Sequence, residues 1–237
     1  MMPDYRSSVM SHILHVTCHE LERLNNLAGI FISFEGLEGA GKSTQHRKLC
    51  NYLEEKKVKF VSSTEPGGTD TGNSIRKILL DKKFNNMKPV TELLLFSAAR
   101  YQHVCEIIKP SLEKGYIVIT DRYVASTIAY QSYGRGLDLR LIKQMNRLAT
   151  EGLYPDITFM LDITPEQSME RLLNRVATTS KKLDRIEEEK IDFFKKVRKG
   201  YLKLAKADPG KFKILDACED VEEIHRKIIF HLKDFIS

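Results

Sequence analysis

The stretch that says most about this chain is Gly36-Leu37-Glu38-Gly39-Ala40-Gly41-Lys42-Ser43. It matches in full the pattern G-x-x-x-x-G-K-S/T of a phosphate-binding loop. Glycines let backbone N–H groups curl around phosphate oxygens without a Cβ clash, and a helix after the loop adds the positive end of its dipole. The pattern predicts that Lys42 reaches the β- and γ-phosphates of a nucleotide and that the Ser43 hydroxyl holds Mg²⁺.

The sequence on both sides of this loop alternates between strand and helix patterns. An apolar β-type run, residues 30–34, precedes the loop, and a helical pattern over 44–56 follows it. Further strands are expected at residues 58–62, 116–120, 157–161 and 212–215, and further helical patterns over most of 70–114, with a break around 85–89, and over 221–235. Several strands lack polar alternation, which indicates a buried parallel sheet. We therefore expect an α/β protein of the P-loop NTPase fold, a five-stranded parallel sheet with helices on both faces and ligands beyond the carboxyl ends of its strands.

Composition sets broader limits. The chain has 237 residues, of which 42% are hydrophobic and 30% charged, and this suits one globular domain. Its formal charge of +6 fits polyanionic ligands, but a solvated basic face is an equal alternative. The four cysteines are far apart, which disfavours a metal site. Neither a run of about 18 apolar residues nor a secretory leader occurs, so we expect a cytoplasmic protein without a membrane span.

Residues 1–28 differ from the rest of the chain. Their apolar side chains fall near helical spacing among several histidines, but no chemistry is evident there. We expect an N-terminal extension over 1–28, helical or disordered, and one domain over 29–237.

Several ordered motifs follow the loop: Glu-Pro-Gly-Gly at 65–68, LLLFSAAR at 93–100, DRY at 121–123 with AYQ and GRG after it, LYPDITFMLDITPE at 153–166 and LDRIE at 183–187. With these motifs the chain resembles bacterial thymidylate kinases from about Phe31 to its end. The resemblance implies phosphorylation of dTMP to dTDP by Mg²⁺-ATP, in the pathway to dTTP, with ATP contacts from Gly36 through Ser43 and Thr44. It also implies a homodimer and a mobile lid over approximately 174–185.

The resemblance also implies which residues bind the acceptor. Phe96 and Arg100 stand four apart and share a helix face, so an aromatic ring lies beside a donor fork. Alone, Phe96 would be a core residue; in the family its counterpart stacks on thymine and that of Arg100 contacts the base. The counterparts of the remaining acceptor residues grip the acceptor phosphate (Arg76), contact the base (Thr127 and Gln131) and crowd out a ribose 2′-hydroxyl (Tyr130).

The catalytic centre is expected at the ends of the phosphate loop and the third strand. Asp121 directly follows that strand and is placed to hold Mg²⁺ with Ser43. By resemblance, Arg122 bridges the donor and acceptor phosphates, with a structural salt bridge as the alternative. Lys42 completes the charge neutralisation. Glu38 meets the acceptor sugar or a lid arginine by resemblance, with a solvated, helix-facing acid as the alternative.

The segment 171–187 is basic and lacks apolar periodicity, so we expect a loop there. Alone, this pattern is typical of a solvated basic loop; by resemblance, the segment forms the lid. By resemblance Arg175 is the catalytic lid arginine, with Arg185 as the alternative because residues 177–182 make the alignment ambiguous. One departure is Thr64, since many bacterial members carry arginine immediately before Glu-Pro-Gly-Gly.

Other functions stay open at this point. One is another nucleoside monophosphate or deoxynucleoside kinase, and another is a nucleotide-dependent switch or a nucleic-acid-binding ATPase. The absence of a guanine-reading N-K-x-D signature disfavours a switch, so we expect ATP and dTMP as partners and no nucleic acid.

Overall fold

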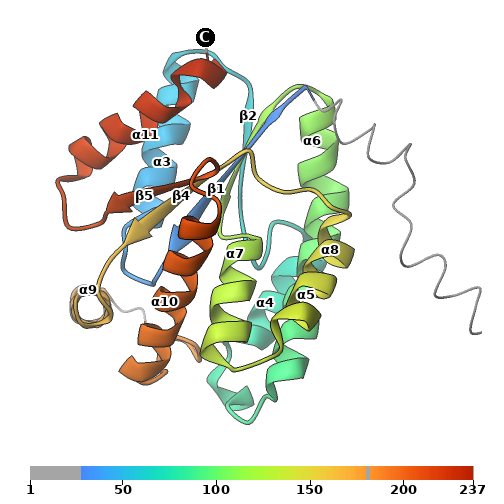
Figure 1. Cartoon of the computed structure of the whole chain (residues 1–237), viewed down its shortest axis with the longest axis vertical. Helices are drawn as coiled ribbons and strands as arrows, with labels where there is room; N and C mark the ends of the chain where they lie inside the picture. The colour runs from blue at the N-terminus through green and yellow to red at the C-terminus, as the bar shows by residue number, and fades with distance from the viewer. Residues whose placement is uncertain (1–27, 180–181, 237) are drawn as a thin grey trace, which may run out of the picture.

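A central sheet with helices on both faces forms the body of the protein (Figure 1). The computed structural model describes residues 28–179 and 182–236. The strands are β1 (Ile30–Gly36), β2 (Phe60–Thr64), β3 (Ile117–Asp121), β4 (Ile157–Asp162) and β5 (Phe212–Asp216). They run parallel in the order β2-β3-β1-β4-β5. The predicted fold class is confirmed.

The helices lie between successive strands, except for the last one, which follows β5. They are α3 (Lys42–Glu55), α4 (Asp70–Leu80), the 3₁₀ turn η1 (Lys82–Phe84), α5 (Pro89–His103), the π-helical η2 (Val104–Ile108), α6 (Lys109–Glu113), α7 (Val124–Thr127), the π-helical η3 (Ile128–Gly134), α8 (Leu139–Thr150), α9 (Pro165–Thr178), α10 (Ile191–Ala207) and α11 (Val221–Ile236). Within residues 28–179 and 182–236, no helix is long and apolar enough to span a membrane.

Strand β1 shows how the sheet is covered on both sides. Because side chains alternate along a strand, Ile32 and Phe34 face one way and Phe31 faces the other. Ile32 and Phe34 belong to the larger core, with buried leucines and isoleucines of α3 and α11, which lie together in Figure 1. Phe31 belongs to a second core with side chains of η2 and α6. Burial on both faces explains why β1 lacks polar alternation.

Several predicted boundaries shift by one or two residues, among them the following three. The strand predicted at 58–62 begins at Phe60, because Lys57 takes a positive φ and the Val58 amide still bonds to Leu53 of α3. The helix predicted from Thr44 begins at Lys42, and the third strand runs one residue further, to Asp121.

The expectation of a loop throughout 171–187 is wrong for its first part. Helix α9 continues to Thr178. It starts with a Thr164–Gln167 capping box and buries Leu172, so its helical signal lies partly before the basic segment. The proposed extension, apart from residue 28, lies outside the described residues.

Two glycines allow close backbone contacts that position the candidate site. Gly36 ends β1 with a φ of 133°, and a Cβ there would lie 2.3 Å from the Leu161 carbonyl oxygen, so only glycine fits between β1 and β4. In α10, a Cβ on Gly200 would lie 2.7 Å from the Tyr133 ring and 3.1 Å from the Cα of Ala129. Helix α10 therefore lies directly against η3, and this contact brings Tyr201 toward the end of β1.

Candidate active site

The phosphate loop joins β1 to α3, and Lys42 is folded over it. The Lys42 Nζ donates to the carbonyl oxygens of Gly36 (3.1 Å) and Leu37 (2.7 Å). Burial, together with the positive charge of Arg122, lowers the pKa of Lys42 to about 8. The loop glycines take positive φ angles: Gly36 (133°), Gly39 (70°) and Gly41 (92°). The loop thus holds a buried cation within a curl of backbone.

Ser43 and Asp121 meet beside this lysine. The Ser43 Oγ donates to Asp121 Oδ2 at 2.9 Å, which joins the first turn of α3 to the end of β3. Hydroxyl and carboxylate oxygens suit Mg²⁺, which keeps water and substrate phosphates as further ligands. The described part of the chain holds no cluster of three or more His, Cys, Asp or Glu side chains suited to a metal. The pair therefore fits a Mg²⁺ ion that takes most of its ligands from nucleotide and water.

Arg122 follows Asp121, and two of its hydrogen-bond partners are themselves bonded to a buried acid. Its backbone takes a φ of 74°, and its Nη1 donates to Gly36 O, Ser126 Oγ and the Tyr201 hydroxyl, each at 3.1 Å. The fully buried Glu35 accepts from Ser126 Oγ (2.6 Å) and from the Tyr201 hydroxyl (3.0 Å). Burial raises the pKa of Glu35, although the Ser126 bond and the Arg122 charge act against it. Glu35 thus orients the groups that orient Arg122.

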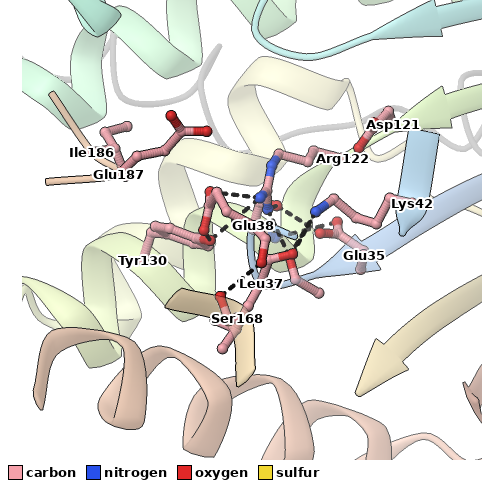
Figure 2. A network of polar contacts seen from close by, with 12 residues as sticks. Glu35, Leu37, Glu38, Lys42, Asp121, Arg122, Tyr130, Ser168, Ile186 and Glu187 are labelled. Atoms are coloured by element: carbon pink, nitrogen blue, oxygen red, sulfur yellow. Dashed lines mark hydrogen bonds and ion pairs between the residues drawn. The ribbon is translucent and has the colours of Figure 1, made fainter. Parts of the chain in front are cut away.

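The other arm of Arg122 reaches Glu38 of the loop (Figure 2). Nη2 donates to Glu38 Oε1 (2.7 Å) and to the Tyr130 hydroxyl (3.3 Å), while that hydroxyl donates to Glu38 Oε2 (2.6 Å). The Glu38 side chain is 14% exposed, so the alternative of a solvated acid is wrong. Its described partners are Arg122 and Tyr130, and not a lid arginine.

Arg100 is buried at the opposite end of the site. Its Nε donates to Glu65 (2.7 Å), and its Nη1 donates to Thr127 (2.7 Å) and Asn146 (2.9 Å). Burial alone would raise the pKa of Glu65, but the Arg100 charge and a bond with His103 lower it below its usual value. An ionised carboxylate therefore fixes the guanidinium that we predict to contact a base.

The predicted acceptor residues converge on this end. Phe96 is half-buried on α5, one turn before Arg100. Gln131 is buried in η3, where its Nε2 donates to Glu92. Arg76 lies on α4, and its Nη1 donates to the Pro66 carbonyl oxygen (2.8 Å).

The two lid arginines have different surroundings. Arg175, near the end of α9, makes a two-pronged ion pair with Glu187 (3.0 and 2.8 Å). Arg185 is buried and donates to the Leu79 carbonyl oxygen (2.7 Å) and to Glu92 (2.6 Å). Arg175 lines the pocket, whereas Arg185 bonds to residues of α4 and α5.

One pocket of about 400 Å³ gathers these groups. The predicted residues that line it are Glu38, Gly39, Lys42, Ser43, Arg76, Phe96, Arg100, Asp121, Arg122, Thr127, Tyr130, Gln131 and Arg175. The lining does not include Arg185, nor the loop residues Gly36, Leu37, Ala40, Gly41 and Thr44. The side chains of Leu37 and Ala40 are buried, so contacts from them to a phosphate would come from the backbone.

Comparison with known proteins identifies the family. The family model of thymidylate kinase matches residues 34–228. This chain belongs to the thymidylate kinase family. The resemblance expected from the motifs is confirmed.

Similar thymidylate kinases cover nearly the same span. A thymidylate kinase of Sulfurihydrogenibium sp. (strain YO3AOP1) is 45% identical over 205 residues, which cover 86% of this chain and 97% of the relative. One from Chlorobaculum tepidum is 47% identical over 204 residues, which cover 84% and 95%. The crystal structure of thymidylate kinase from Ehrlichia chaffeensis matches with a TM-score of 0.68 and 37% identity, over 86% of this chain and 98% of that chain.

Sequence reasoning missed the acids and the tyrosine that hold the predicted site residues in place. Glu65 and Glu187 lie inside motifs typical of the thymidylate kinase family, and Glu35 directly precedes the phosphate loop, but the sequence alone gives none of them a separate role. Tyr201 and Glu92 belong to no motif. A buried acid at a strand end, as at Glu35, is a usable signal, whereas Tyr201 in an amphipathic helix gives none.

The departure at Thr64 is accommodated locally. Its Oγ1 donates to the Asp121 carbonyl oxygen at 3.3 Å, and its side chain lines the pocket. The position therefore joins the ends of β2 and β3.

Proposed function

We propose that this chain transfers the γ-phosphoryl group of ATP to the phosphate of dTMP in the pocket described above. One observation carries the proposal: the cations Lys42, Arg122 and Arg175 line the same cavity as Phe96 and Arg100. Groups that can neutralise phosphate charge and groups that can recognise a base thus line one pocket. Its volume is within the range of small-molecule sites.

The chemistry requires positioning more than proton transfer. The acceptor is a phosphate dianion, which is a competent nucleophile near neutral pH, so no general base is required. Lys42 and Arg122 would hold the two phosphate groups end to end, and Arg175 would approach from the lid. When bound between Ser43 and Asp121, Mg²⁺ would neutralise charge on the ATP phosphates.

Selection of the acceptor would come from the far end of the pocket. The Phe96 ring offers a stacking surface, and Arg100 offers a planar donor held by Glu65. Arg76 would hold the acceptor phosphate. The Tyr130 hydroxyl, fixed by Glu38, would leave no space for a ribose 2′-hydroxyl.

A coupled assay of ADP release tests the proposal. We expect the highest kcat/KM with dTMP, lower values with dUMP and UMP, no turnover of thymidine, and loss of all turnover when EDTA removes Mg²⁺. Faster turnover of UMP or thymidine than of dTMP would instead indicate another nucleotide or nucleoside kinase. Tight DNA binding that persists at 200 mM salt would support a nucleic-acid-binding ATPase.

We also propose a homodimer formed through α5 and α8. These helices pack against each other, and exposed apolar side chains recur along one stripe of each: Val90, Leu94 and Tyr101 on α5, and Leu141 and Leu148 on α8. Exposed apolar stripes of this kind mark protein interfaces. Light scattering should give twice the chain mass of 27.3 kDa, and Leu94→Glu should give the single-chain mass.

The proposed location is the cytoplasm, where both nucleotides are available. The described cysteines, Cys50, Cys105 and Cys218, are free thiols, as a reducing compartment would keep them. Cell fractionation tests this proposal.

A further inference from the structure

A buried carboxylate outside the pocket accepts a hydrogen bond from a residue that lines the pocket. Glu92, on α5, is 1% exposed and does not line the cavity. It accepts from Gln131 Nε2 (2.9 Å), Arg135 Nε (3.0 Å) and Nη2 (3.1 Å), and Arg185 Nη2 (2.6 Å). Burial acts to raise the pKa of Glu92, but the bonds and the charge of Arg135 lower it. Glu92 is therefore ionised near neutral pH, and both of its oxygens only accept.

This carboxylate fixes the direction of the Gln131 amide. An amide side chain offers an NH₂ donor on one side and a carbonyl acceptor on the other, and exchanging the two sides needs only a half-turn. A half-turn of Gln131 would set its oxygen against an ionised Glu92, so the half-turn is excluded. Gln131 lines the pocket, and its Oε1 has no hydrogen-bond partner within the described residues. The group that Gln131 presents to a ligand is therefore an acceptor.

Arg100 supplies the matching donor. Its Nε and Nη1 are committed to Glu65, Thr127 and Asn146, and no acceptor in the described part of the chain bonds its Nη2. A donor and an acceptor thus line the same pocket as the Phe96 ring. Thymine and uracil offer the complement, an O4 acceptor beside an N3–H donor, whereas cytosine offers an N4 donor beside an N3 acceptor.

We infer that Glu92 is the positioning residue for base specificity: by holding the Gln131 amide with its oxygen toward the pocket, it makes the site accept pyrimidines that carry N3–H and reject cytosine. This inference rests on the proposed function and adds the residue that sets the choice of base. Arg135 and Arg185 keep Glu92 ionised and in place, although neither lines the pocket.

The test is the ratio of kcat/KM for dTMP to that for dCMP, measured by ADP release. In Glu92→Gln, residue 92 can donate as well as accept, so Gln131 can turn and present its NH₂. We expect the ratio to fall at least about tenfold, with a gain in dCMP turnover. Glu189→Gln is the matched control, because Glu189 pairs with Arg135 on the outer side of the same cluster. It should lower the unfolding temperature and leave the ratio unchanged.

Gln131→Met keeps the test decisive if Glu92→Gln does not fold. It removes the acceptor without burying a new charge, so kcat/KM for dTMP should fall about tenfold while that for dCMP does not fall. A ratio equal to that of the unmodified protein in folded Glu92→Gln, or in folded Gln131→Met, overturns the inference. Failure of the unmodified protein to phosphorylate dTMP is a separate result and would reject the proposed function.

Discussion

Replacing Arg122 by alanine tests the centre of the proposed mechanism. Arg122 contacts five hydrogen-bond acceptors: three share the two N–H groups of Nη1, and two bond to Nη2. Its side chain is only 16% exposed. It is therefore held in place before any substrate binds. Removing one such preorganised donor costs about 2.7–4 kcal/mol of transition-state stabilisation, so turnover should fall by about 10²–10³.

The same change has a cost in stability that must be measured separately. Without Arg122, the Glu38 carboxylate loses its ion pair but keeps the bond from the Tyr130 hydroxyl. Because Glu38 is 14% exposed, the loss should be smaller than for a fully buried pair, about 2 kcal/mol. In a chain of this size that corresponds to about 4–8 °C in unfolding temperature. Arg122→Lys keeps a charge beside Glu38 and should lose less stability.

The assay compares initial rates of ADP release at saturating ATP and dTMP, at least about 15 °C below the unfolding temperatures of both variants. Circular dichroism confirms the fold at the assay temperature. A folded Arg122→Ala protein with near-normal turnover would show that Arg122 is a structural ion pair and not part of the catalytic centre.

Three further predictions concern Lys42, the two arginines Arg175 and Arg185, and Glu65. Lys42→Ala should lower turnover at least about a hundredfold with the fold retained, as seen by ADP release and circular dichroism. Arg175→Ala should lower turnover about a hundredfold and also lower the unfolding temperature, because the buried Glu187 loses its two-pronged partner. Arg185→Ala should lower the unfolding temperature, because its buried carboxylate partner on α5 loses a donor, and should leave turnover nearly unchanged below that temperature; a hundredfold loss of turnover in Arg185→Ala alone would make Arg185 the catalytic lid residue. The third prediction concerns the pH dependence of stability. The pKa of Glu65 in the fold lies below its usual 4.5, because burial, which acts to raise it, is outweighed by the charge of Arg100 together with the hydrogen bonds from His103 and Arg100. Its stabilising contribution is therefore complete above about pH 4.5 and is lost as pH falls through the lower, folded-state pKa. Urea unfolding between pH 6 and 3 should show less acid sensitivity in Glu65→Gln, and equal slopes would contradict this.

Local patterns in the sequence predicted much of the molecule. The phosphate loop depends on neighbouring residues, so its glycines and Lys42 could be placed from the sequence alone. The spacing of Phe96 and Arg100 predicted a shared helix face, and both line one pocket. Strand ends were predicted to within one or two residues, since a turn such as that at Lys57 has no strong sequence signal.

The supporting contacts could not be predicted in this way, because they join distant parts of the chain. Tyr201 meets Arg122 across 79 positions, and Arg185 meets Glu92 across 93. Both depend on how helices pack over the sheet, and neither pair follows a local period. The helical start of the lid segment was missed for a different reason, since its capping box begins at Thr164, before the basic stretch.

Gly200 shows that a residue without a reactive side chain can still determine the geometry of the active site. No ligand need ever touch it, yet a single added methyl group would push α10 away from Tyr133 and carry the neighbouring Tyr201 with it. The hydroxyl that steadies Arg122 would move, and so would the guanidinium. A saturation survey of this gene should therefore find Gly200 as intolerant of change as the lysine of the phosphate loop, although the two lie on different helices and share no chemistry.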